Sequence, residues 1–137
     1  MSATLVVDTG PLVALLAPRE PRHRWAREAL AVKGRVATCE AVVSEAFFLL
    51  QASESGSRSL RSMLAGQTLE LLSMAGEVRA VTRLMERYAS VPMSFADGCL
   101  VRLSELLPGA LVVTLDSDFR VYRRFSRQVV PVLAPNP

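Results

Sequence analysis

The stretch LVVDTGPLVALL (residues 5–16) places one carboxylate between two apolar segments. Its first three residues, Leu-Val-Val, are typical of a strand that is buried on both faces of a sheet. Asp8 follows directly, and a Thr-Gly-Pro sequence then separates the strand from a short apolar helix predicted at about 10–17. Because desolvating a carboxylate costs several kcal/mol, the position of Asp8 at the mouth of a buried strand requires a compensating partner.

The rest of the chain repeats this succession of apolar strands and helices. Because strands that alternate with helices form parallel sheets covered on both faces, we expect a three-layer α/β fold with a central parallel sheet of four to five strands. Residues 1–137 are expected to form one domain, with a loose tail after about residue 133. The predicted strands are 4–7, 35–37, 68–72, 110–115 and 129–133, and the predicted helices are 10–17, Pro21 to about Lys33, 39–52, 59–65, 76–89, 94–107 and 118–125, with a loop at 53–59.

The composition excludes some classes of protein. No apolar run is long enough to cross a membrane, so no membrane span is expected, and no signal peptide is recognised. Cys39 and Cys99 lack the spacing of a metal site and are predicted to be small buried residues, which favours a reducing cytoplasm. The net charge is +3, and every basic residue except Lys33 is an arginine. Arginine suits forked contacts with phosphate, although a coding bias produces the same preference.

The aspartates are few, and each lies beside an apolar segment. Asp116 ends the predicted strand at 110–115, as Asp8 ends the first strand. If these strands are neighbours, both carboxylates face the crevice at the carboxyl end of the sheet, where α/β proteins bind ligands. The alternative is helix capping, by Asp8 near Thr9 and by Asp116 or Asp118 before Phe119.

Two further acids lie on predicted helices. Counting by three and four residues places Glu45 on an apolar helix face, and the alternative there is a buried ion pair with an arginine. Asp97 lies in an apolar segment at the start of a helix, where Ser94 and Asp97 also fit a capping box. Both functions are compatible, because the first turn of a helix can face the crevice.

Four converging carboxylates would repel one another and raise each other's pKa. One hard divalent cation removes that penalty, and oxygen ligands favour Mg²⁺ or Mn²⁺. Such ions polarise phosphate oxygens and activate water, which predicts metal-assisted hydrolysis of phosphodiesters. The only histidine, His23, cannot supply the two-histidine acid–base pair of a metal-free ribonuclease. The sequence contains no nucleophile elbow, phosphate-binding glycine loop or dinucleotide fingerprint.

With Asp8, Glu45, Asp97 and Asp116 in this order, the sequence resembles PIN domains, and among them the VapC-type toxins of bacterial and archaeal toxin–antitoxin pairs. The matching stretches are VVDTGPLVALL, SEAFFLL, MSFADGCLVRLSEL and VVTLDSDFRVYRR. The resemblance implies a PIN-like parallel sheet between helices, an acidic pocket that binds Mg²⁺ or Mn²⁺, and cleavage of RNA.

The resemblance also implies a role for each site residue. The expected catalytic acids are Asp8, Glu45, Asp97 and Asp116; the expected metal ligands are Asp8, Asp97, Asp116 and, as an accessory, Asp118; the expected auxiliary residues are Thr9, Thr114 and Ser117. Many relatives carry a further Asp three residues before the third acid, where this chain has Ser94. This difference puts a second metal in doubt, not the first.

Basic residues follow the last acid and are expected to contact the RNA backbone. Arg120, Arg123 and Arg124 are the predicted nucleic-acid-binding residues, with Arg127 beside them, and a solvated basic face is the alternative. Tyr122 is expected to pack in the core or an interface rather than to stack on bases. The resemblance further implies a homodimer and a cognate antitoxin that occupies the groove near the acids.

Two other functions compete with that of a metal-dependent endoribonuclease. The VVDTG sequence at residues 6–10 also resembles the Asp-Thr-Gly signature of aspartic proteases, whose fold is nearly all β. The second alternative is a non-catalytic PIN module that binds RNA or a protein partner.

Overall fold

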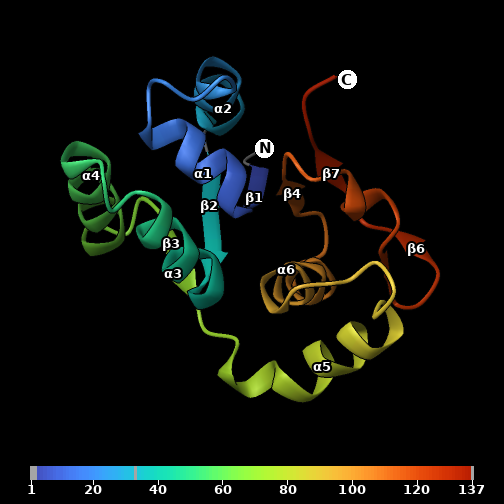
Figure 1. The fold of residues 1–137 in the computed structure, drawn as a ribbon. Helices are drawn as coiled ribbons and strands as arrows, with labels where there is room; N and C mark the ends of the chain where they lie inside the picture. Colours follow the sequence, from blue (N-terminus) through green and yellow to red (C-terminus); the bar gives the residue numbers. More distant parts are fainter. Residues whose placement is uncertain (1–2, 33, 137) are drawn as a thin grey trace.

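A computed structural model describes residues 3–32 and 34–136 and shows a central sheet between helices (Figure 1). The sheet has five strands in the order β3-β2-β1-β4-β7, and every neighbouring pair is parallel. The predicted three-layer α/β fold is therefore confirmed, and the all-β aspartic-protease alternative is wrong. The strands are β1 (Ala3–Val7), β2 (Gly34–Cys39), β3 (Glu70–Leu72), β4 (Leu111–Val113) and β7 (Val132–Leu133).

Helices cover the sheet in two groups. Helix α6 packs on β1, β2 and β4, with α5 against it, whereas α1 contacts α2, α3 and α4. No helix in the described part of the chain is long and apolar enough to span a membrane. The helices are α1 (Thr9–Leu16), α2 (His23–Leu30), α3 (Glu40–Leu49), α4 (Glu54–Ala65), α5 (Val78–Arg87) and α6 (Phe95–Leu106), with 3₁₀ turns η1 (Ala75–Glu77) and η2 (Ser117–Arg120).

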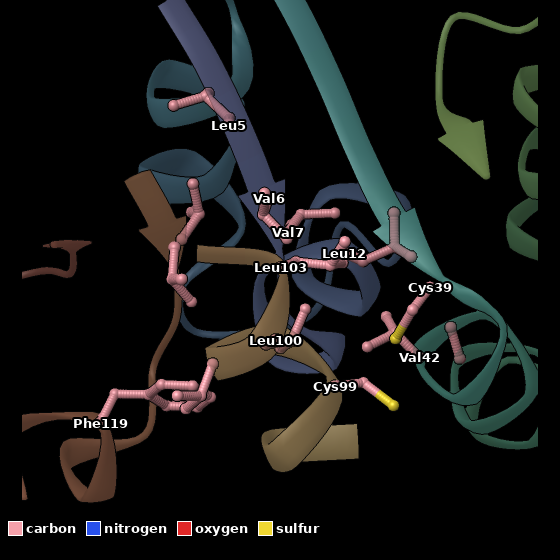
Figure 2. Packing of buried hydrophobic residues seen from close by; sticks show 14 of the residues in the cluster. Leu5, Val6, Val7, Leu12, Cys39, Val42, Cys99, Leu100, Leu103 and Phe119 are labelled. Carbon is pink, nitrogen blue, oxygen red and sulfur yellow. The ribbon is translucent and has the colours of Figure 1, made fainter. Parts of the chain in front are cut away.

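The apolar run of β1 forms the centre of the core. Leu5, Val6 and Val7 are at most 1% exposed, and side chains from α1 and α6 pack against them in Figure 2. Burial of a strand on both faces explains why its sequence is uniformly apolar rather than alternating. Cys39 and Cys99 are buried free thiols in the same core, as predicted.

The register of the sheet brings two sequence-distant acids to one edge. Val7 pairs with Val113 of β4, and the Asp8 amide donates to the Val113 carbonyl at 2.9 Å. Strands β1 and β4 both end at this edge of the sheet. The residues that follow them are Asp8 after β1 and, three residues after β4, Asp116. The expectation that these strands are neighbours is confirmed.

The segment 53–59, expected to be a loop, belongs to helix α4, so that prediction is wrong. Ser53 caps the helix, because its hydroxyl accepts a hydrogen bond from the Gly56 amide at 3.1 Å. Gly56 is buried, and a Cβ there would lie 3.1 Å from the Leu16 carbonyl oxygen. Ser53 therefore caps the helix and Gly56 allows a close contact with α1, so these small residues do not indicate a loop.

The predicted helix 118–125 is also wrong, because η2 ends at Arg120. The chain then enters a small antiparallel hairpin of β5 (Arg123–Arg124) and β6 (Gln128–Val129). The predicted strand 129–133 is correspondingly divided between β6 and β7. Helix α2 ends at Leu30 rather than near Lys33, which lies outside the described residues.

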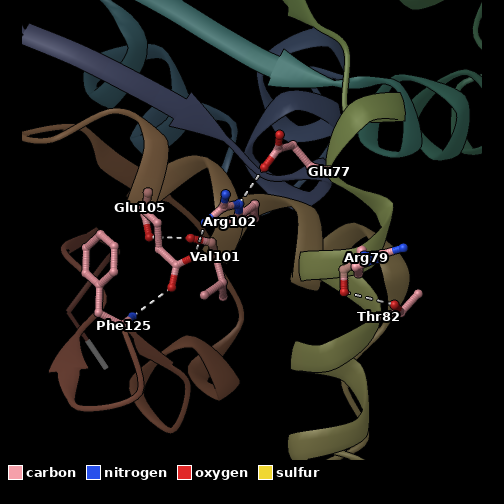
Figure 3. A network of polar contacts seen from close by, with 8 residues as sticks. Glu77, Arg79, Thr82, Val101, Arg102, Glu105 and Phe125 are labelled. Carbon is pink, nitrogen blue, oxygen red and sulfur yellow. Dashed lines mark hydrogen bonds and ion pairs between the residues drawn. The ribbon is translucent and has the colours of Figure 1, made fainter.

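An ionic network fixes this hairpin to α6 (Figure 3). Arg102 contacts Glu77 at 2.7 Å and Glu105 at 3.0 Å, and Glu105 accepts a hydrogen bond from the Phe125 amide at 2.7 Å. Phe125 and the next residue, Ser126, have positive φ angles of 49° and 69°. Residues other than glycine rarely adopt this backbone conformation unless the surrounding structure restrains the turn. The network therefore determines where the chain around Tyr122 lies relative to α6.

Replacing the α4 cap tests the corrected helix boundary. We expect Ser53→Ala to lower the free energy of unfolding by about 1 kcal/mol, because the Gly56 amide loses its acceptor. Urea denaturation measures the change. Ser59→Ala, at an exposed position inside α4, is the matched control and is expected to be neutral; equal losses in both variants would contradict the cap.

Candidate functional site

One open cleft at the carboxyl edge of the sheet collects every predicted acid. Its volume is about 640 Å³, and its walls come from the ends of β1 and β4, from α3 and from the start of α6. The sequence-distant side chains that line it include Asp8, Glu45, Asp97, Asp116 and Asp118, together with Thr9, Ser94 and Ser117.

Asp8 is the most buried acid of the cleft, with 8% exposure. Its Oδ1 accepts from the Thr9 amide and its Oδ2 from the Thr114 hydroxyl, both at 2.8 Å. Thr114 Oγ1 in turn accepts from the Asp116 amide at 2.9 Å, which connects the two strand ends. Asp8 is the N-cap of α1, so the capping alternative is correct for this residue and coexists with its place in the cleft.

Burial dominates the titration of Asp8. Desolvation raises the pKa of its carboxyl to about 6, although the hydrogen bonds from Thr114 and Thr9 act in the opposite direction. The negative charges of Asp97 and Asp116 act in the same direction as burial and are part of this raised pKa.

Asp97 lies in the first turn of α6, where its amide donates to Ser94 Oγ at 3.0 Å. The Ser94 cap is therefore confirmed. Partial burial raises the pKa of the Asp97 carboxyl, a hydrogen bond from Tyr122 lowers it, and the charge of Asp116 raises it again. The side chain thus participates in the same electrostatic cluster as Asp8 and Asp116.

Tyr122 is a member of the site that sequence reasoning missed. Its hydroxyl donates to Asp97 Oδ2 at 2.8 Å, and its buried ring meets Tyr88 and Phe119 edge-on, with centroids 5.2 Å away in each case. Burial and the contact with Asp97 raise the pKa of this phenol above its ordinary value, so it stays protonated and donates. The prediction of core packing is confirmed, but no sequence pattern pairs Tyr122 with Asp97.

The remaining acids are more open to solvent. Asp116 is exposed and caps η2, accepting from the Asp118 amide at 2.9 Å. Glu45 is exposed rather than buried, and no ion pair involves it within residues 3–32 and 34–136. The alternative of a buried Glu45–arginine pair is therefore wrong. The apolar residue Phe48 on the same helix is 66% exposed, so this face of α3 is open.

Two of the three predicted RNA-binding arginines contact the protein itself. Arg123 donates through Nη1 to the carbonyls of Arg120, Val121 and Tyr122, and Arg124 donates through Nη1 to the Ser104 carbonyl at 3.1 Å. Arg120 is exposed and makes no side-chain hydrogen bond or ion pair to any described residue. Its side chain is thus the most available of the three for phosphate.

The cleft has the ligand chemistry of a hydrated hard cation. Its donors are carboxylate and hydroxyl oxygens, and the buried Thr9 Oγ1 has no hydrogen-bond partner among the described residues. As the side chains stand, no group of three acids, histidines or cysteines in the described chain is close enough to surround a metal ion. Mg²⁺ fits this arrangement, because it usually retains several waters and binds one or two protein carboxylates plus substrate phosphates.

Tyr122→Phe removes one hydroxyl and tests the contact with Asp97. Without that donor we expect the pKa of Asp97 to rise, because the hydrogen bond stabilises the ionised carboxylate. Carboxyl ¹³C NMR titration measures it. Tyr88→Phe is the matched control, because the Tyr88 hydroxyl accepts from the Arg123 amide instead. An unchanged Asp97 midpoint in Tyr122→Phe would contradict the contact.

The raised pKa of Asp8 predicts a pH-dependent stability without divalent ions. The folded state binds this proton more tightly than the unfolded state, so stability falls as pH rises from about 4 through about 6. We therefore expect Asp8→Asn to raise the free energy of unfolding at pH 7.5 by on the order of 2 kcal/mol. The gain should fade towards pH 4, where Asp8 is protonated. Denaturation with EDTA at both pH values measures it, and a less stable variant at pH 7.5 would refute the assignment.

Comparison with known proteins gives consistent results. The sequence model of the PIN domain family matches residues 5–124. VapC20 from Mycobacterium tuberculosis, described as a Sarcin-Ricin loop cleaving toxin, aligns with a TM-score of 0.76 and 18% identity over 90% of this chain and 98% of that one. VapBC2 from Rickettsia felis, solved with a promoter DNA fragment, aligns with a TM-score of 0.65 and 13% identity over 97% and 99%.

A third similar structure is described as a PIN domain endonuclease. The PIN domain endonuclease Utp24 aligns with a TM-score of 0.53 and 16% identity over 98% of this chain and 86% of that one. A search of curated protein sequences finds no match. At these identities the structural likeness shows a shared fold, which agrees with the parallel sheet described above.

Proposed function

This chain belongs to the PIN domain family, and from that premise we propose that it is a metal-dependent endoribonuclease, which hydrolyses RNA phosphodiester bonds. The observation that carries the proposal is the convergence of five carboxylates from four separate chain segments on one open cleft. A buried carboxylate whose pKa is raised to about 6 weakens the metal-free fold. A bound cation explains its presence, because the cation compensates the charge.

Each acid of the cleft takes a distinct part in this proposal. Asp8, Asp97 and Asp116 would hold Mg²⁺ or Mn²⁺, with Asp118 as an accessory ligand; such an ion would supply polarisation of the phosphate and a lowered pKa of water. Thr114 orients Asp8 by its hydrogen bond and also holds the Asp116 amide. Glu45, exposed on the cleft wall, accepts the proton of the attacking water.

Two auxiliary residues, Thr9 and Ser117, also line the cleft. Thr9 contributes a buried hydroxyl without a partner among the described residues, and Ser117 contributes a hydroxyl beside Asp116. In the reaction, water adds to phosphorus, the bond from phosphorus to the leaving ribose oxygen breaks, and that oxygen takes a proton. The non-catalytic PIN module is the alternative that the experiment below separates from an enzyme.

The biological role we propose is that of the toxin in a type II toxin–antitoxin pair. Its support is the likeness in fold to VapC20, which is described as cleaving the Sarcin-Ricin loop, and to VapBC2. A cognate antitoxin and a homodimer are the partners that follow from this role. The location that we propose for this activity is the cytoplasm.

Cleavage of labelled total RNA tests the proposal directly. We expect cleavage with Mg²⁺, loss in EDTA, and recovery with Mn²⁺. Asp97→Asn should reduce the rate at least 100-fold, on the order expected when a catalytic charge is removed, with little change in melting temperature. Glu86→Gln, an exposed acid on α5 outside the cleft, is the matched control.

Two results would count against the enzyme, and a third would count against the catalytic role of Asp97. RNA binding without cleavage by the wild-type protein would favour the non-catalytic module. Cleavage that persists in Asp8→Asn would indicate a contaminating nuclease. An Asp97→Asn variant that loses stability but cleaves normally would show that Asp97 only stabilises the start of α6.

A further inference from the structure

A second, smaller hollow adjoins the acidic cleft. Its volume is about 190 Å³, and two arginines line it: Arg22, which precedes α2, and Arg120, at the end of η2. Leu115, Asp116 and Ser117 line both this hollow and the acidic cleft. The two spaces therefore adjoin one short segment that follows β4. We call the smaller one the arginine hollow.

The guanidinium groups of the arginine hollow have no protein acceptor within the described residues. Neither Arg22 nor Arg120 forms an ion pair, and both side chains are exposed. Some other arginines of this chain are paired with acids: Arg35 pairs with Glu70, and Arg102 with two glutamates. Each guanidinium carries five N–H donors and can bind two oxygens of a phosphate group through parallel hydrogen bonds. The pair therefore offers the hollow donors that suit a phosphate group.

The size and most of the lining agree with such a ligand, and the Asp116 carboxylate is the one acid among the described residues that lines the hollow. At about 30 Å³ for each water in the liquid, the hollow holds the volume of roughly six waters, which is enough for a phosphate group. Asn136 adds a side-chain amide, and Phe119 and Val132 form an apolar wall.

Resting on the proposed function, we infer that the arginine hollow binds the RNA phosphate next to the one that is cleaved. A single strand that presents one phosphate to the acids extends past Leu115–Ser117 and presents its neighbour to Arg22 and Arg120. Phosphate contacts of this kind position a nucleic acid without reading its sequence. The arginine hollow thus determines which phosphate of the RNA strand lies at the acids.

RNA binding in EDTA tests the arginine hollow, because we expect no cleavage without a divalent ion. The probe is a fluorescein-labelled uridine decanucleotide, followed by anisotropy over a range of NaCl concentrations. We expect Arg22→Ala/Arg120→Ala to weaken binding about tenfold and to reduce the slope of log K against log salt by about 0.7, the value for one phosphate contact on a single strand.

The matched control removes the same charge elsewhere. Arg79 and Arg83 are exposed on α5, form no ion pair with described residues, and line neither the hollow nor the cleft. Arg79→Ala/Arg83→Ala is expected to change affinity less than twofold. Arg22→Lys/Arg120→Lys should keep the salt slope and weaken binding, because lysine retains the charge but not the forked geometry.

The outcomes separate the two proposals. If the wild-type protein cleaves RNA and both double-alanine variants bind the probe equally, the arginine hollow is not a phosphate site and the endoribonuclease proposal stands. If the wild-type protein neither binds nor cleaves RNA, both proposals fail. A tenfold loss confined to the Arg22/Arg120 variants supports the hollow, provided that circular dichroism and melting temperature match those of the wild-type protein.

Discussion

The carboxylate of Asp8 is the constraint on which the rest of the site depends. It lies at the end of a strand buried on both faces, and burial raises its pKa to about 6. Two donors hold its oxygens: the Thr9 amide at the start of α1 and the Thr114 hydroxyl at the end of β4. The same parallel pairing that builds the core therefore determines where the first acid points, and the hydroxyl of Thr114 extends the arrangement to Asp116.

Two other acids of the cleft, Asp97 and Asp116, also lie at helix starts that carry a cap. Asp116 caps η2, and Asp97 follows the Ser94 cap of α6. Amides at helix N-termini are partly positive and offset some of the repulsion among neighbouring carboxylates. Capping and metal binding are thus compatible functions of one side chain. Tyr122 adds a third element, since its hydroxyl orients Asp97 from the hairpin that follows η2.

The parallel sheet and the five acids were predictable because both depend on local patterns: uniformly apolar strands, and carboxylates placed directly after them or in a helix start. The start of α4 was not predictable, because a serine- and glycine-rich segment is typical of a loop. Only the structure shows that Gly56 packs near the Leu16 carbonyl and belongs to the helix. The Tyr122–Asp97 contact and the arginine hollow join residues far apart in sequence across turns, and no periodicity encodes such contacts.

The central claim is that these acids hold a divalent ion in one cleft. The most direct measurement is an anomalous difference map from crystals of the protein soaked in Mn²⁺, recorded near the manganese absorption edge. The account predicts a peak in the cleft within coordination distance of carboxylate oxygens from Asp8, Asp97 or Asp116. Full occupancy at another place in the molecule, or no peak at a saturating Mn²⁺ concentration, would contradict it.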